Sequence, residues 1–117
     1  MNPRRFINVY NHFHIGKDTK IGEFCDIAGE IGDNCKIQAG VIIPGLTKIG
    51  SNVFIGANVV FTNDKYMDGN LEGVEVEDGV KIGANSTILA GVKIGKDSII
   101  GMGSIILKDV PPNAKVV

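Results

Sequence analysis

The sequence lacks the features that mark several large protein classes. It has no tryptophan, and its two cysteines, Cys25 and Cys35, are too few for a disulfide framework or a zinc ribbon. Neither charge is in excess, because 12 basic and 13 acidic residues give a net charge of −1. This balance argues against a nucleic-acid partner or a basic membrane-binding surface. No apolar run approaches the roughly 20 residues of a membrane span, and the N-terminus has no signal-peptide pattern. We therefore expect a cytoplasmic protein with no membrane partner.

The length of 117 residues allows one domain, which we expect to span residues 1–117. A lone core of this size buries only about two-thirds of its chain's surface, so oligomerisation is expected from the outset. Glycine is the residue in excess. The chain has 16 glycines, about twice the usual share.

Aliphatic residues recur at steps of six along most of the chain. The series slips once, by two residues, between Ile27 and Ile31, and it is interrupted once after Phe61. Its members are Ile15, Ile21, Ile27, Ile31, Ile37, Ile43, Ile49, Ile55, Phe61, Val76, Ile82, Ile88, Ile94, Ile100 and Ile106. A period of six matches neither period of a helix, and the many glycines and β-branched residues also disfavour one.

The position three residues after each of these aliphatic residues is expected to form a turn. It is Asn, Asp or Gly in 12 of 14 units, types that tolerate a left-handed backbone, and Phe24 and Leu46 are the exceptions. A small or β-branched residue stands one place later, two before the next aliphatic, so strand alternation turns both side chains inward. Short strands separated by regular turns predict an all-β solenoid whose repeats contact only their neighbours.

The pattern [LIV]-G-x-x-x-x resembles the hexapeptide-repeat acyltransferases, whose fold is a left-handed parallel β-helix, and the resemblance runs from about residue 9 to 115. That family has three hexapeptides per coil, which implies about five coils here. The residue before each aliphatic points outward and is mostly charged. Five units instead place an apolar residue there: Ile42, Phe54, Val60, Ile99 and Ile105. Such an outward strip suggests a subunit interface, and the resemblance implies a homotrimer with active sites between subunits.

One loop should protrude from this regular frame. The step from Phe61 to Val76 is 15 residues instead of six, so nine residues are additional, and they lie within about 62–75. Irregular segments on rigid scaffolds often carry function.

The stretch Asn52–Tyr66 (NVFIGANVVFTNDKY) resembles sugar-nucleotide N-acetyltransferases that acylate amino sugars for surface polysaccharides. The resemblance implies that Asn63 lies beside the acceptor amine, with Tyr66 and Asp64 as further catalytic-site residues. Two alternatives stay open: Asp64 is a left-handed turn residue, or Tyr66 only anchors the loop. Related O-acetyltransferases carry a catalytic histidine in this loop, where this chain has none. An amine, unlike a hydroxyl, needs no general base once it is deprotonated.

The last repeats resemble the acetyl-CoA segment of these enzymes, commonly G-A-G-S-x-V-x-K-D-x-P. By this match four residues would line the acetyl-CoA groove: Ala84, Ala90, Gly101 and Met102. Lys108 would meet a CoA phosphate as a point charge. The alternatives are that the turn pattern alone requires Gly101 and that Lys108 is a solvated lysine. Family members also continue into a G-x-P-A segment beyond the point where this chain stops.

Other interpretations are weaker. His12 and His14 resemble part of the zinc site of γ-class carbonic anhydrases, but the third histidine is absent, so no metal is expected. Cys25 and Cys35 both fall on the small inward position, which predicts core packing. The alternative functions are an O-acetyltransferase acting on a sugar and a non-catalytic scaffold or inactive homologue. The identity of the amino sugar and the length of the acyl group stay open.

Overall fold

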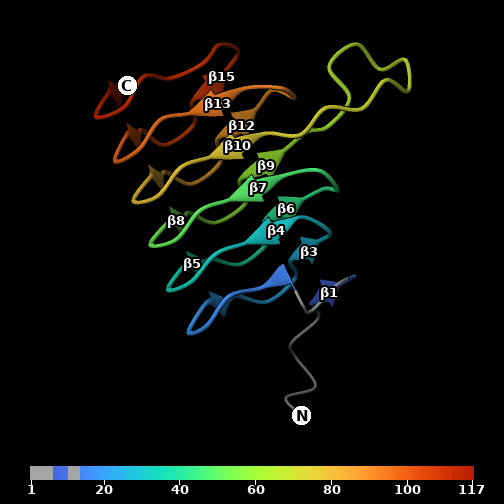
Figure 1. Cartoon of the computed structure of the whole chain (residues 1–117), viewed down its shortest axis with the longest axis vertical. Helices are drawn as coiled ribbons and strands as arrows, with labels where there is room; N and C mark the ends of the chain where they lie inside the picture. Colours follow the sequence, from blue (N-terminus) through green and yellow to red (C-terminus); the bar gives the residue numbers. More distant parts are fainter. Residues whose placement is uncertain (1–6, 11–13) are drawn as a thin grey trace.

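The chain winds into a parallel β-helix with three faces (Figure 1). The computed structural model describes residues 7–10 and 14–117. Face 1 stacks β1 (Asn8–Val9), β3 (Asp26–Ile27), β6 (Ile42–Ile43), β9 (Val60–Phe61), β12 (Thr87–Ile88) and β15 (Ile105–Ile106). Face 2 stacks β4 (Glu30–Ile31), β7 (Lys48–Ile49), β10 (Glu75–Val76) and β13 (Lys93–Ile94). Face 3 stacks β2 (Lys20–Ile21), β5 (Lys36–Ile37), β8 (Phe54–Ile55), β11 (Lys81–Ile82), β14 (Ile99–Ile100) and β16 (Lys115–Val116).

The all-β, solenoidal fold class is therefore confirmed, and it is consistent with the left-handed form. The number of coils is about six, one more than expected. Single bridges from Ile15 to Ile31 and from Ile94 to Val110 extend face 2 at both ends, so each face has six levels. The extra coil arises because β1 and β16, outside the regular series, still pair with the coil beside them.

Equivalent residues in successive coils stack in register. Ile37 pairs with Ile55, 18 residues later, whereas Ile21 pairs with Ile37 across only 16. The shorter coil explains the two-residue slip in the sequence. Its corner between β3 and β4 contains only Ala28 and Gly29. A Cβ on Gly29 would lie 2.6 Å from the Thr47 carbonyl oxygen, so this tight corner excludes larger residues.

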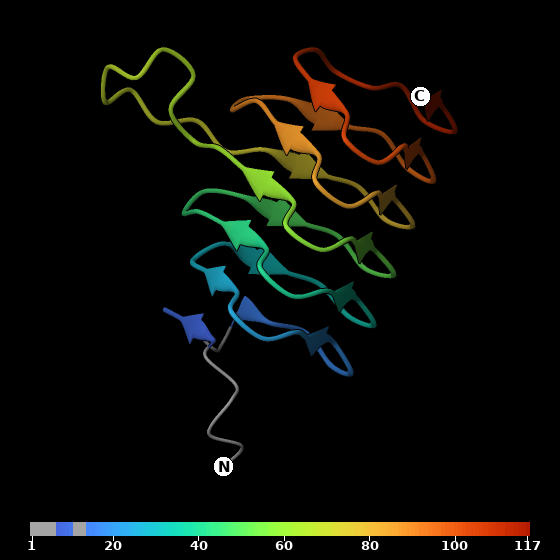
Figure 2. The ribbon, with the colours of Figure 1, turned by 180° about the vertical axis from the view of Figure 1, so that it is seen from behind.

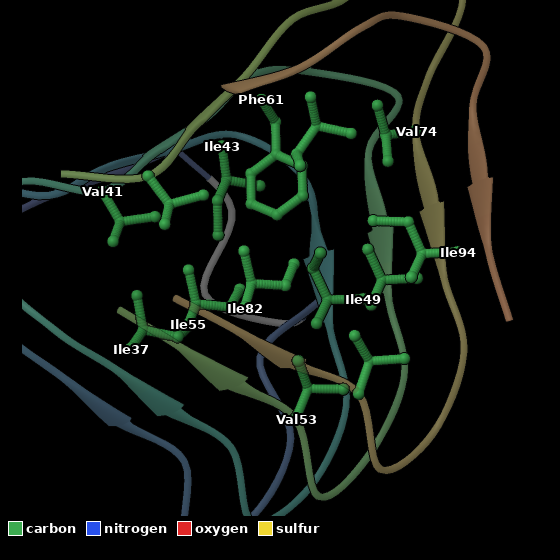
Figure 3. Packing of buried hydrophobic residues seen from close by; sticks show 14 of the residues in the cluster. Ile37, Val41, Ile43, Ile49, Val53, Ile55, Phe61, Val74, Ile82 and Ile94 are labelled. Carbon is green, nitrogen blue, oxygen red and sulfur yellow. The ribbon is translucent and has the colours of Figure 1, made fainter. Parts of the chain in front are cut away.

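The core is a single column of inward side chains (Figure 3). Ile37, Ile55 and Ile82 enter it from face 3, Ile43 and Phe61 from face 1, and Ile49 and Ile94 from face 2. Small side chains fill the corners beside them, and both cysteines are among these buried residues, as predicted. Cys25 Sγ donates a hydrogen bond to the Gln38 carbonyl at 3.2 Å, and Cys35 Sγ donates to the Gly50 carbonyl at 3.1 Å.

Most turn predictions are confirmed. Ten of the twelve Asn, Asp or Gly turn positions have positive φ, and Asp64 and Asp109 do not. Their carboxylates accept backbone hydrogen bonds instead: Asp109 accepts one from Lys93 N at 2.9 Å, and Asp64 accepts two within its own loop. Phe24 (φ 62°) and Leu46 (φ 74°) adopt the left-handed conformation without a favourable side chain. The turn is therefore imposed by the coil rather than by the local residue.

The three faces differ in the residues that they show to the outside. Face 2 alternates in charge, with Lys48 paired to Glu30 on one side and Glu75 on the other. The five predicted outward apolar residues do not form one strip: face 1 carries Ile42, Val60 and Ile105, and the other two lie on face 3. Ile42 pairs with Val60 as expected. Face 3 is a row of lysines interrupted by Phe54 and Ile99. In the described part of the chain no helix has the length and apolar character to cross a membrane.

Replacing Thr47 with valine should raise stability. Thr47 is fully buried, and its Oγ1 has no hydrogen-bond partner in the described part of the chain. An unpaired buried hydroxyl costs about 1–3 kcal/mol, which an isosteric methyl group avoids. We expect Thr47→Val to increase the free energy of unfolding by about 1 kcal/mol in urea denaturation. As a control, Ser98→Ala should lower it, because Ser98 Oγ donates to the Pro111 carbonyl at 2.8 Å. A loss of stability in Thr47→Val would contradict the assignment.

Stability should fall in mild alkali because of Cys35. Burial raises the pKa of the Cys35 thiol above its ordinary value of about 8.5. Above that pH the unfolded chain releases the thiol proton while the folded chain retains it, so stability decreases as pH rises. The denaturation midpoint should therefore fall more steeply between pH 8 and about pH 10 for the native chain than for Cys35→Ala. Equal slopes would contradict the prediction.

Candidate functional site

An irregular loop leaves the wall of the helix between β9 and β10 (Figures 1 and 2). It lies at the corner where the chain passes from face 1 to face 2, which we call corner 1–2. Both views show it projecting outward at the level of the C-terminal coils.

The base of the loop is held by hydrogen bonds to the next coil. Thr62 Oγ1 donates to the Ile88 carbonyl at 2.9 Å and accepts from Ala90 N at 2.8 Å. Glu72 N donates to the Asn63 carbonyl at 2.9 Å, so a hydrogen bond joins the two ends of the loop. These bonds hold the base of the loop in place, and β9 and β10 keep their pairing with the strands of the neighbouring coils.

Asn63 lies at this base and is half-buried. Its Nδ2 donates to the Gly45 carbonyl at 3.2 Å, at the same corner one coil earlier. The bond fixes which way the amide faces. Its Oδ1 has no hydrogen bond from any residue that the structure describes, so a ligand donor can reach it.

Asp64 organises the tip of the loop. Its carboxylate accepts hydrogen bonds from Asp68 N at 3.0 Å and Gly69 N at 2.9 Å. Met67 (φ 56°) and Gly69 supply the left-handed conformations that the sequence pattern predicted at Asp64, so that alternative for Asp64 is wrong. The Asn70 backbone N–H, at 3.1 Å from Oδ1, holds the pKa of Asp68 below its ordinary value.

Tyr66 stands exposed on the tip beside Met67 and Leu71. The Lys65 ammonium lies 5.3 Å from the centre of the Tyr66 ring, a weak cation–π contact at an exposed site. None of the residues that the structure describes covers this tip, whose apolar side chains suit contact with a second molecule.

The predicted acetyl-CoA residues occupy two corners. Ala84 and Met102 stack at the corner between face 3 and face 1, which we call corner 3–1, where Gly103 N donates to the Ala84 carbonyl at 2.9 Å. A Cβ on Gly83 would lie 2.5 Å from Met102 N, so the backbones are in close contact. Gly101 precedes Met102 at this corner. Met102 is 81% exposed.

Ala90 and Lys108 lie instead at corner 1–2, with the loop. Ala90 is only 2% exposed, and its backbone N–H anchors Thr62, so its position in the structure supports the loop. Lys108 is exposed one coil further on. Face 1 therefore separates Ala84, Gly101 and Met102 from Asn63, Asp64, Tyr66, Ala90 and Lys108 within one chain.

An open groove of about 730 Å³, which was not predicted from the sequence, lies on face 3 and corner 3–1 of the coils that precede the loop. Phe24, Phe54, Lys20 and Lys36 are among its lining residues. Two signals for it were present in the sequence. Phe24 breaks the turn pattern, and Phe54 breaks the charged outward pattern.

The histidine pair yields no metal site among the residues described. His12 lies outside them, and His14 Nδ1 lies 3.8 Å from Glu30 Oε1. The described residues hold no group of three or more His, Cys, Asp or Glu arranged to bind an ion.

Residues 29–63 and 73–108 match the family described as bacterial transferase hexapeptide (six repeats). Among curated proteins, the bifunctional protein GlmU of Bartonella bacilliformis is 40% identical over 101 residues, which cover 86% of this chain and 22% of that protein. The chain thus spans about a fifth of the length of this relative.

Two solved acetyltransferases share the fold. The hexapeptide-repeat-containing acetyltransferase VCA0836 of Vibrio cholerae superposes with a TM-score of 0.74 at 28% identity, covering 87% of this chain and 66% of that one. Its structure complexed with acetyl coenzyme A gives a TM-score of 0.72 at 24% identity, covering 87% and 64%. A maltose O-acetyltransferase of Clostridium difficile gives 0.65 at 26% identity, covering 94% and 60%.

Proposed function

Because the chain belongs to the hexapeptide-repeat family of bacterial transferases, we propose that it transfers an acetyl group from acetyl-CoA to the amine of an amino sugar. The observation that carries the proposal is the anchored loop at corner 1–2. Its base presents a fixed Asn63 amide, and its tip presents exposed aromatic and apolar side chains. The similarity to the acetyltransferase VCA0836 supports the same chemistry.

The reaction requires orientation more than acid–base assistance. The amine nitrogen attacks the thioester carbonyl carbon, the C–S bond breaks, and the CoA thiolate takes up the proton that the amine loses. Asn63 Oδ1 would accept a hydrogen bond from the amine and aim its lone pair at the carbonyl. Backbone N–H groups are suited to stabilise the tetrahedral oxyanion. A loop without histidine is compatible with an amine acceptor and less so with a hydroxyl.

The active site would form between two copies of the chain in a homotrimer. In one chain, face 1 separates the loop from corner 3–1, which contains Ala84 and Met102. Packing two copies side by side would bring the loop of one against corner 3–1 of the next. The outward apolar residues of face 1 support such packing, because Ile42 and Ile105 are exposed there in the single chain.

An O-acetyltransferase is the second candidate. The fold similarity to the maltose O-acetyltransferase favours it. The products separate the two cases, since hydroxylamine cleaves an acetyl ester and leaves an amide intact.

Reversing the charge at Lys108 should weaken acetyl-CoA binding. A charged hydrogen bond to phosphate contributes about 1.5–3 kcal/mol, so its loss corresponds to roughly a 10- to 100-fold lower affinity in Lys108→Glu. Calorimetry measures the affinity, and the mass in solution should stay that of the native oligomer. Lys96→Glu, on another corner, is the control and should bind normally. A native chain that does not bind acetyl-CoA would contradict the proposal and favour the scaffold.

Removing the amide of Asn63 should slow the chemical step. Misplacement of the attacking group costs roughly 100-fold, so kcat of Asn63→Ala should fall by about that factor. The KM for acetyl-CoA should be unchanged, because the thioester is held elsewhere. Asn70→Ala, at the exposed tip of the same loop, is the matched control. An unchanged kcat in Asn63→Ala would show that Asn63 only secures the loop.

A further inference from the structure

One glycine at corner 1–2, Gly45, is not required by the fold. Every other glycine either has a positive φ or would bring a Cβ to within 3.0 Å of a neighbouring atom. Gly45 has neither property, because its φ is outside the left-handed region and a Cβ there would have no atom of the described residues within 4 Å. The same repeat position, two residues after the aliphatic one, carries a side chain in every other unit except at Gly29, where the tight corner excludes one. The fold alone therefore does not explain Gly45.

Gly45 stacks in one column with three candidate site residues. Asn63, Ala90 and Lys108 occupy the same repeat position at corner 1–2 of the following coils. Neighbouring coils are about 4.8 Å apart, and Asn63 Nδ2 donates to the Gly45 carbonyl at 3.2 Å. A side chain at residue 45 would therefore occupy the space beside the amide that the proposed reaction uses.

The open space lies on the side of Asn63 that faces the preceding coils. Towards the following coil, the base of the loop and the buried Ala90 fill the corner. Towards the preceding coil, the corner between β3 and β4 contains only residues 28–29, whereas the corner between β6 and β7 contains four residues. Because the shorter corner is cut back, corner 1–2 has a step next to Gly45. The two-residue slip of the repeat thus leaves room for a ligand there.

The turn that contains Gly45 offers a polar group and an apolar one. The Gly45 N–H makes no hydrogen bond with any residue that the structure describes. Ala90 N, at the same repeat position, is bound by the Thr62 hydroxyl, but the counterpart of Thr62 below Gly45 is Ala28, whose side chain has no acceptor. Leu46 is 58% exposed and holds its side chain outward in a left-handed conformation. Both groups suit a sugar ring, which has hydroxyls around its edge and C–H groups on its faces.

We propose that Gly45 is a specificity-determining residue, because the acceptor sugar lies over it while the amine meets Asn63. The inference rests on the proposed function and adds the direction of the acceptor, whose ring extends from Asn63 towards the N-terminal coils. The Gly45 N–H donates to a hydroxyl oxygen of the ring, and Leu46 contacts its apolar face. Glycine leaves the space that the ring needs, and any side chain at this position narrows it.

The test compares Gly45→Val and Gly45→Ala with the native chain. Release of the CoA thiol is measured with glucosamine, galactosamine and their UDP-linked forms as acceptors. For each amino sugar that the native chain acetylates, kcat/KM should fall by roughly 10- to 200-fold in Gly45→Val, as expected for added methyl groups in a fitted site, and by less in Gly45→Ala. The calorimetric affinity for acetyl-CoA should be unchanged.

Lys96→Val is the matched control. Residue 96 occupies the same repeat position as Gly45 at a different corner, after β13, so the variant places the same side chain away from the site. Its kcat/KM should equal that of the native chain.

Stability distinguishes a steric effect on binding from damage to the fold. Because a Cβ at Gly45 has space and the backbone conformation does not favour glycine, the urea midpoint of Gly45→Ala should be no lower than that of the native chain. A lower midpoint would assign the glycine to folding and overturn the proposal.

Two further outcomes would overturn it. One is an unchanged kcat/KM in Gly45→Val, and the other is a parallel loss of acetyl-CoA binding, which would place residue 45 in the cofactor groove. A native chain that acetylates none of these amino sugars refutes the proposed function, and this inference with it. An active native chain whose Gly45→Val variant is equally active refutes this inference alone.

Discussion

The structure depends on hydrogen bonds between coils. No strand exceeds two residues in the described part of the chain, so no strand is stable except against its neighbours. Lys36 N donates to the Val53 carbonyl at 3.0 Å and Phe54 N to the Val80 carbonyl at 2.9 Å, and the pattern repeats up the wall. Extra residues can be accommodated only where they leave the wall at a corner. The loop after β9 does this, because β9 and β10 both keep their partners. A variable segment is thereby attached to a rigid frame.

The same ladder constrains the inward residues and leaves the outward ones free. Each inward position must fill a column of fixed width, whereas each outward position meets solvent or another molecule. The outward residues therefore differ between the three faces. They alternate in charge on face 2, include several apolar residues on face 1, and are lysines with Phe54 and Ile99 on face 3. Face 2 is adapted to solvent, whereas the other two faces carry the features that call for a partner or a ligand. Function in this fold is thus a property of which outward residues the coils stack together.

This division explains what could be predicted from the sequence. The aliphatic period locates all strands from β2 to β15, because inward side chains are selected by a repeating environment. Asn63 could be singled out from the loop, but its bond to the Gly45 carbonyl joins residues 18 apart that lie at the same corner of successive coils. Phe54 lies 18 residues from Lys36 and 27 from Lys81, since the loop intervenes, so their stacking requires the register of the coils. The groove was hidden for the same reason.

At two corners the left-handed turn position holds a residue other than Asn, Asp or Gly, and both corners lie beside candidate site features. Phe24 is at the groove, and Leu46 is beneath the loop, where its carbonyl oxygen occupies the place that a Cβ on Gly73 would need. Asparagine or glycine at either position would relieve about 1–2 kcal/mol of backbone strain. Stability alone therefore does not account for these residues, and neither side chain is in the core. The strained conformation holds a large apolar side chain outward on a rigid turn, next to a place where a ligand would bind. The departures from the repeat are thus better guides to the sites than the repeat itself.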